Sequence, residues 1–295
     1  RKESSAASDV YKRQVPHPHP PSASGTDFRA SGCRSSDPSH HPLHAMNTSP
    51  AIRDQVALVT GANTGMGLAT VRALLDAGYR VAATDLRTDN VAAALAEHGD
   101  RLACFTMDVT DVDQVHAACG QIEARFGRID VCINNAGYLQ YANCEQTTPE
   151  LWRKTLQVNL DGVFYVSQRV APGMKARGFG RIVNMASFGA KTGGLSPVPA
   201  YAASKGGVIS LTFSFAREYA AFGVTCNALA PTFVKTQMLT DQVSAERQAE
   251  LRQKIPVGRF CELEELAHCV LFLAHPLSGF ITGEVLDLNG GLQFD

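Results

Sequence analysis

Two side chains that can exchange a proton stand one helical turn apart in the second half of the chain. Residues 201–205 read YAASK, which places the phenol of Tyr201 and the ammonium of Lys205 at positions i and i+4. On a helix these two positions share a face. An ordinary packed pair has the same spacing, so the pair predicts chemistry only if other residues supply the rest of a site.

A glycine-rich stretch is the first such partner. Residues 60–67 read TGANTGMG, directly after a short apolar run and before residues with helical spacing. Gly61, Gly65 and Gly67 would keep side chains away from a pyrophosphate, while the helix N-terminus would offer free N–H groups and a positive dipole end. A plain turn gives the same letters, but the strand–turn–helix context favours a dinucleotide-binding turn.

A carboxylate stands where the second strand is expected to end. Asp85 closes the run VAATD, 18 residues after Gly67, at the place where a carboxylate accepts hydrogen bonds from the hydroxyls of the adenosine ribose. Its charge would repel a 2′-phosphate, so NAD is predicted as the cofactor in preference to NADP. Arg87, two residues on, would partly offset that repulsion. An aspartate that merely begins a turn is the alternative interpretation.

The elements that must position these residues follow a regular order. From residue 55, short apolar runs alternate with amphipathic helical segments, the pattern of a parallel sheet covered on both faces. The second half adds a long helix near 151–177, a strand in GRIVNMAS, a helix at about 201–222, and then further strands and a last helix. We therefore predict an α/β fold, with one doubly wound Rossmann-type domain at 46–295 and a seven-stranded, mostly parallel sheet.

Composition excludes several classes of protein. The 295 residues carry a formal net charge of −1 and 45% hydrophobic residues, which is typical of a globular domain without a nucleic-acid partner. No apolar run approaches the length of a membrane span, so no membrane partner is predicted. The eight cysteines form no CxxC pair and no Cys/His ligand spacing. We predict no metal site, and free thiols in a cytoplasmic protein.

The first 45 residues differ in composition from the rest. They hold five of the nine histidines, many prolines and serines, and few large apolar residues. Such a segment cannot bury enough surface to offset the entropy lost on ordering. We predict that residues 1–45 are a disordered, non-native extension and that the protein begins at Met46. A transit peptide is the alternative, disfavoured by the acidic residues and the missing amphipathic period.

Taken in order, these motifs resemble one family. TGANTGMG, NNAG at 134–137, Asn159 in QVNLDGVF, Ser187 in IVNMASFGA and YAASK follow the order and rough spacing of the short-chain dehydrogenase/reductase family. The resemblance covers roughly residues 52–295. Within the family, the sequence is most similar to the branch that includes 3-oxoacyl-acyl-carrier-protein reductases and polyol and sugar dehydrogenases. It implies reversible hydride transfer between a nicotinamide cofactor and a secondary alcohol or ketone, of polyol, sugar, hydroxy acid or 3-oxoacyl type.

The resemblance assigns four catalytic residues. Tyr201 would exchange a proton with the substrate oxygen, and Lys205 would lower the pKa of that phenol and hold the nicotinamide ribose. Ser187 would hydrogen-bond the substrate oxygen as charge develops on it. Asn159 would hold a water that connects Lys205 to bulk solvent.

The resemblance also implies the contacts of the cofactor. Asp108 and Val109 would meet the adenine edge, and the turn at 135–137 would pass beside the adenosine ribose. The family usually has Pro-Gly after the sixth strand, whereas this chain has Pro231 and Thr232, which we interpret as a tuning variation. The residues expected to bind the cofactor are Gly61, Asn63, Thr64, Gly65, Met66, Gly67, Asp85, Asp108, Val109, Asn135, Ala136, Gly137, Tyr201, Lys205, Pro231, Thr232, Val234 and Thr236.

The substrate and the assembly are less closely specified. Segments 137–145, 188–200 and the lid-like 236–258 are expected to form the substrate walls. Apolar residues around much of the helices at 151–177 and 201–222 predict a homotetramer, or a homodimer. The alternatives are a non-catalytic nucleotide-binding regulator, a 3-oxoacyl-acyl-carrier-protein reductase using NADPH, and an enoyl reductase or epimerase. The complete catalytic set disfavours the regulator, and the short Tyr–Lys spacing disfavours the enoyl reductase.

Overall fold

A computed structural model describes residues 52, 55–237, 239 and 243–294. The chain divides into two units, Arg1–Met46 and Asn47–Asp295, and the described residues all belong to the second. The predicted disordered extension at 1–45 therefore lies outside the described residues.

The second unit is built on a seven-stranded sheet with the order β3-β2-β1-β4-β5-β6-β7, and every neighbouring pair is parallel. The predicted seven strands are confirmed, and the sheet is wholly rather than mostly parallel. The strands are β1 (Val56–Thr60), β2 (Arg80–Asp85), β3 (Leu102–Thr106), β4 (Val131–Asn134), β5 (Gly180–Met185), β6 (Val224–Pro231) and β7 (Val285–Leu288).

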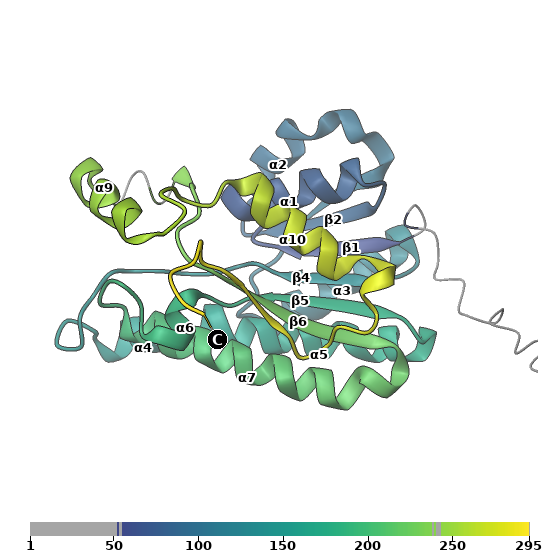
Figure 1. Cartoon of the computed structure of the whole chain (residues 1–295). Helices are drawn as coiled ribbons and strands as arrows, with labels where there is room; N and C mark the ends of the chain where they lie inside the picture. The colour runs from purple at the N-terminus through teal and green to yellow at the C-terminus, as the bar shows by residue number, and fades with distance from the viewer. Residues whose placement is uncertain (1–51, 53–54, 238, 240–242, 295) are drawn as a thin grey trace, which may run out of the picture. The chain divides into compact units, whose positions relative to one another are not determined.

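Helices cover both faces of this sheet (Figure 1). The α-helices are α1 (Gly65–Asp76), α2 (Asp89–Ala94), α3 (Val112–Phe126), α4 (Pro149–Leu156), α5 (Gly162–Arg177), α6 (Phe188–Thr192), α7 (Pro199–Tyr219), α9 (Ala245–Lys254) and α10 (Leu263–Ala274). Short 3-10 turns lie at Ala96–Arg101, Ala220–Phe222 and Pro276–Ser278, and a π turn lies at Gln157–Asp161. None of the described helices is long and apolar enough to cross a membrane.

The alternation of side chains along β1 explains the two-sided core. Val56 and Leu58 pack into the cluster beneath α3, α5 and α7, whereas Ala57 and Val59 pack into the cluster beneath α1 and α10. All four side chains are fully buried, because a central strand has a helix layer on each side. This is why β1 reads as a continuous apolar run.

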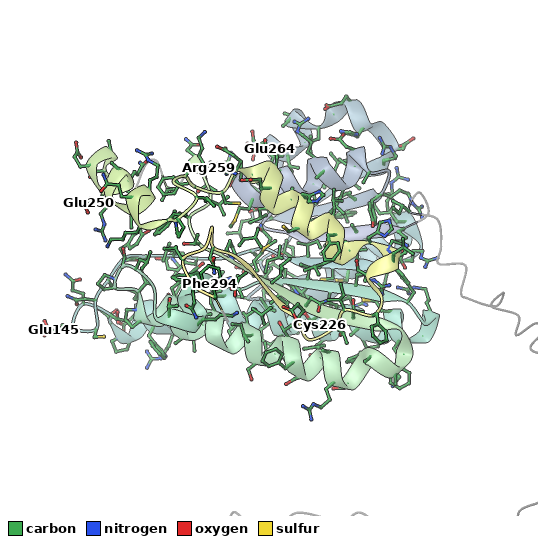
Figure 2. The ribbon with its side chains drawn as sticks, viewed as in Figure 1. Glu145, Cys226, Glu250, Arg259, Glu264 and Phe294 are labelled. Carbon is green, nitrogen blue, oxygen red and sulfur yellow. The ribbon has the colours of Figure 1, made fainter. Side chains whose placement is uncertain are left out.

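The strand order places a crevice at the carboxyl end of β1. Because β1 pairs with β2 on one side and β4 on the other, the connections leave in opposite directions at this point. Ligands of doubly wound sheets bind at such a switch point. The helices α6 and α9, which follow β5 and β6, lie at the same end of the sheet (Figure 1). Glu145 and Glu250 project outward there (Figure 2).

Two helical segments in the structure differ from those predicted from the sequence. The helix near 151–177 is interrupted by the π turn at Gln157–Asp161, so α4 and α5 are separate. The segment expected to be helical after Asp89 ends as α2 at Ala94, and a 3-10 turn follows that contains Gly99 at φ 55°. Leu95, with φ −130° and ψ 22°, already leaves the helical region and ends α2, and the positive φ of Gly99 then turns the chain toward β3.

Candidate active site

The β1–α1 turn has no space for side chains at two of its glycines. A Cβ on Gly67 would lie 2.0 Å from the carbonyl oxygen of Gly61, and a Cβ on Gly61 would lie 2.7 Å from Cα of Ala136. Gly61 and Gly65 also have φ values of 62° and 53°, which glycine adopts without strain. The turn therefore brings backbone N–H groups, rather than side chains, to the N-terminus of α1.

The turn after β4 holds the glycine turn in place. Asn135 donates from Nδ2 to the carbonyl oxygens of Thr60 and Gly61, at 3.0 and 2.9 Å. The backbone N–H groups of Asn135 and Ala136 both donate to Thr60 Oγ1 at 3.0 Å. These bonds join two turns that the sequence separates by more than 70 residues. The role of Asn135 is thus to support the phosphate turn.

Asp85 connects the end of β2 to the same turn. Its Oδ2 accepts a hydrogen bond from the backbone N–H of Asn63 at 3.0 Å. The side chain of Asn63 in turn accepts from Asn90 N and holds the first turn of α2. Arg87 forms an exposed ion pair with Asp89 at 2.9 Å. The cation that the sequence places near Asp85 is thus engaged by a different carboxylate.

Asp108 and Val109 lie beyond β3, on the far wall of the same crevice. Asp108 Oδ1 accepts from Thr110 N and Thr110 Oγ1, at 2.9 and 2.8 Å, which fixes the loop. Val109 packs against Gly162 at the start of α5, where a Cβ would lie 2.7 Å from Val109 Cγ2. The loop after β3 is therefore locked against the helix layer.

A cavity of about 800 Å³ connects these turns to the start of α7. It is lined by every residue predicted for cofactor binding or catalysis except Asn63 and Asn159. The glycines without space for a Cβ, the helix N-terminus and the carboxylate of Asp85 together fit a dinucleotide, with its pyrophosphate at α1 and its ribose at β2. Thr232 and Thr236 belong to the wall formed after β6. No cluster of side chains in the described part of the chain could hold a metal ion.

Tyr201, Ser187 and Lys205 meet at the other end of this cavity. Ser187 lies two residues after the end of β5 and caps α6, since Gly189 N donates to Ser187 Oγ at 3.1 Å. Tyr201 and Ser187 both line the cavity, and the Ser187 hydroxyl is close enough to lower the pKa of the Tyr201 phenol. Lys205, one turn along α7, lies with Nζ 5.8 Å from the centroid of the Tyr201 ring and donates to the carbonyl oxygen of Met185 at 2.6 Å.

The pKa of Tyr201 is shifted upward, opposite to the direction expected from the sequence. Burial raises it above the ordinary value of 10.0, although the nearby Ser187 hydroxyl lowers it. The net pKa of the phenol is thus raised rather than lowered in the protein without cofactor, and the predicted influence of Lys205 on it stays a prediction. The physical reason is that burial removes the water that would stabilise a phenolate. Burial acts on Lys205 as well and lowers the pKa of its ammonium from 10.5 to about 8.

The side chain of Asn159 is engaged by protein atoms, and its predicted role in holding a water stays a prediction. It is fully buried in the π turn, where its Oδ1 accepts from Tyr138 N at 2.7 Å. Its Nδ2 donates to Tyr138 O at 2.9 Å and to Ser204 Oγ at 3.0 Å. Both amide protons are thus engaged by protein atoms. The side chain clamps the loop at Tyr138 to α7, as π turns at functional sites often do.

Sequence reasoning missed three groups of this site. Ser204 lies inside YAASK and joins Asn159 to the carbonyl oxygen of Tyr201, the latter at 2.7 Å. The Met185 carbonyl holds Lys205, and Lys154 lines the cavity from α4. The spacing of Ser204 from Tyr201, three residues on one helix, was a usable signal. The other two depend on tertiary contacts that no local pattern records.

Comparisons with known proteins agree with this geometry. The family model described as Enoyl-(Acyl carrier protein) reductase matches residues 61–293. Acetoacetyl-CoA reductase from Rhizobium meliloti (strain 1021) is 39% identical over 240 residues, which are 81% of this chain and 99% of that protein. D-threitol dehydrogenase from Mycolicibacterium smegmatis is 40% identical over 240 residues, which are 80% of this chain and 92% of that protein.

A solved structure has the same fold. The gluconate 5-dehydrogenase from Burkholderia cenocepacia J2315, in complex with NADP and tartrate, matches with a TM-score of 0.76 and 35% identity. The match covers 81% of this chain and 94% of that one. The chain belongs to the short-chain dehydrogenase/reductase family and is an oxidoreductase that transfers a hydride between a nicotinamide cofactor and a secondary alcohol or ketone.

Proposed function

We propose that the protein reversibly oxidises a small polyol, sugar or hydroxy acid, with Tyr201 as the group that exchanges the substrate proton. The observation that carries the proposal is that Tyr201, Ser187 and Lys205 line the same cavity as the glycine turn. A proton donor is placed there at the end of a dinucleotide site. That arrangement serves chemistry at an oxygen-bearing carbon.

The roles of the side chains follow from their positions. The nicotinamide ring of the bound cofactor supplies the hydride acceptor or donor. Tyr201 gives its Oη proton to the substrate oxygen in reduction and takes one back in oxidation. Its raised pKa keeps the phenol protonated at neutral pH, ready to donate. Ser187 Oγ hydrogen-bonds the same substrate oxygen and stabilises the charge that develops on it.

Lys205 acts beside the phenol rather than on the substrate. Its ammonium, held by the Met185 carbonyl, favours the phenolate that forms when Tyr201 releases its proton. With a pKa of about 8, Lys205 is charged at neutral pH and also loses its proton readily. Asn159 and Ser204 fix the loop at Tyr138 against this helix.

The proposed cofactor is NAD in preference to NADP. The carboxylate of Asp85 supports this choice, because a 2′-phosphate beside it would be repelled, while Arg87 is occupied by Asp89. The gluconate 5-dehydrogenase relative was solved with NADP, which argues for the other cofactor. The ratio of kcat/KM with NAD to that with NADP measures the preference. Asp85→Ala should lower this ratio, and an unchanged ratio would contradict the role of Asp85.

A 3-oxoacyl-acyl-carrier-protein reductase using NADPH is the second candidate. It is favoured by the names of several relatives, among them the FabG reductase of Thermotoga maritima, which is 36% identical over 244 residues. A reductase of this kind would prefer 3-oxoacyl thioesters to free polyols and sugar acids. A higher kcat/KM for a 3-oxoacyl thioester with NADPH than for polyols and sugar acids with NAD would favour this second candidate.

A homo-oligomer, with a tetramer ahead of a dimer, is the proposed assembly. Large apolar side chains on the outer surface support it, with Phe213 on α7 47% exposed and Phe272 on α10 49% exposed. Light scattering that gave a monomeric mass would contradict it. We also propose a cytoplasmic location, because the cysteines of the described residues are free thiols.

The function is tested with a panel of alcohols and ketones. Turnover is followed by the absorbance of the reduced nicotinamide, with NAD and NADP in parallel. Tyr201→Phe should lower kcat/KM by at least about 100-fold, the usual worth of a positioned acid or base, while leaving cofactor affinity nearly unchanged. A Tyr201→Phe variant with wild-type activity would refute the assignment of Tyr201.

A further inference from the structure

The substrate end of the cavity carries one charge that the mechanism does not use. Among the described residues that line the cavity, four are charged, namely Asp85, Asp108, Lys154 and Lys205. The two aspartates belong to the loops after β2 and β3, and Lys205 is engaged with Met185 O. Lys154 lies apart from them, near the end of α4.

Lys154 is held in a defined place without a carboxylate partner. Its Nζ lies 4.3 Å from the centroid of the Tyr138 ring, and it forms no ion pair within the described part of the chain. Lys191 and Lys235, by comparison, are paired with Asp287 and Glu262. An ammonium over an aromatic face keeps its full positive charge.

The backbone of Tyr138, whose ring lies beside Lys154, is fixed to Asn159. Both the N–H and the carbonyl of Tyr138 are hydrogen-bonded to Asn159, at 2.7 and 2.9 Å. The preceding residue is Gly137, where a Cβ would lie 3.8 Å from Lys205 Nζ. Lys154 lines the same cavity as Tyr201 and Ser187, so a substrate bound there can meet this cation.

We propose that Lys154 binds a carboxylate of the substrate, so that the preferred substrate is a small hydroxy acid or the matching oxo acid rather than a neutral polyol. This inference rests on the proposed function. An ammonium and a carboxylate form a charge-assisted hydrogen bond. Apart from Asp85, Asp108 and Lys205, the other residues that line the cavity, which include Leu139, Tyr141 and Gln157, are neutral. A single cation matches one carboxylate better than a phosphate, which carries up to about two negative charges.

The experiment compares acids with neutral substrates of the same skeleton. The pairs are an aldonate with its alditol, and 3-hydroxybutyrate with its amide; a sugar phosphate is the third arm. Wild-type protein, Lys154→Gln and Lys175→Gln are assayed with NAD. Lys175 is a matched control, since it is also exposed and its Nζ also lies over an aromatic ring, that of Phe222 at 3.9 Å, outside the cavity.

Wild-type protein should prefer the acid of each pair. Lys154→Gln should lower the ratio of kcat/KM for acid to that for neutral substrate by about tenfold, through KM rather than kcat. Lys175→Gln should leave the ratio unchanged. High salt should lower the ratio in wild-type protein but not in Lys154→Gln, because an exposed ion pair is screened.

Calorimetry gives a readout that does not need turnover. Binding of tartrate to the protein with NAD should weaken about tenfold in Lys154→Gln. The inference would be overturned if wild-type protein had equal kcat/KM for acids and neutral substrates, or if it preferred the phosphate. It would also be overturned if Lys154→Gln left the ratio unchanged, or if wild-type protein did not bind tartrate. Absence of turnover with every substrate would instead refute the proposed function, and tartrate binding would still decide the role of Lys154.

Discussion

The buried ammonium of Lys205 makes the stability of the protein depend on pH. Its pKa is about 8 in the folded protein and 10.5 when it is free of burial. Between these values the unfolded chain binds the proton and the folded chain does not. The free energy of unfolding must therefore rise with pH across this window, and the effect is complete above the higher value. Lys205→Met removes the titrating group and with it this dependence.

The size of the effect follows from the two pKa values. Each pH unit between them is worth about 1.36 kcal/mol, so the full window is worth about 3 kcal/mol. From pH 7 to pH 9, one unit above the folded value, the difference amounts to about 1 kcal/mol. Wild-type protein should gain this much stability relative to Lys205→Met over those two pH units.

Urea unfolding measures the difference directly. Both proteins are unfolded without cofactor at pH 7 and pH 9, at the same protein concentration, and the gap between their free energies of unfolding is compared. Ser204→Ala is the control, because it alters the same helix and removes no titrating group, so its gap from wild type should not change with pH. A gap for Lys205→Met that is constant from pH 7 to pH 9 would refute the reasoning.

Two further changes test the frame around the site. Gly67→Ala would place a Cβ 2.0 Å from the Gly61 carbonyl oxygen, so it should lower stability by about 1–3 kcal/mol and weaken cofactor binding, measured by urea unfolding and cofactor titration. Gly120→Ala in α3, where a Cβ meets no atom within 4 Å, should instead be neutral or stabilising, and equal effects of the two would contradict the steric argument. Asn159→Ala leaves the N–H and carbonyl of Tyr138 unpaired, so it should cost about 1–3 kcal/mol and lower kcat/KM. Wild-type stability in Asn159→Ala would show that the clamp is dispensable.

The sheet was predictable because its pattern is local. Each buried strand reads as a short apolar run, and glycines such as Gly127, which has φ 84° at the end of α3, separate the helices from the strands. The helices α6 and α9 were expected only as substrate walls. The segment FGAKT is too short to show a helical period, and α9 is mostly polar, so neither gives a strong signal.

The candidate site was predictable as a set of residues but not as a set of contacts. The motifs placed Ser187, Tyr201 and Lys205 in one cavity. The raised pKa of Tyr201 was not predictable, because it depends on burial by elements distant in the sequence. The same holds for the clamp of Asn159, since a π turn uses the same residue types as an α-helix and leaves no trace in the apolar pattern.

The π turn also sets the angular phase of α4. A π turn contains one residue more than the α-helical turn it replaces, and one residue corresponds to a rotation of about 100° around a helix axis. Deleting a residue from Gln157–Asp161 would rotate α4 by that angle relative to α5 and carry Lys154 to another side of the helix. The residues that α4 contributes to the cavity can thus be exchanged by a one-residue change in length, while the sheet and α7 stay as they are.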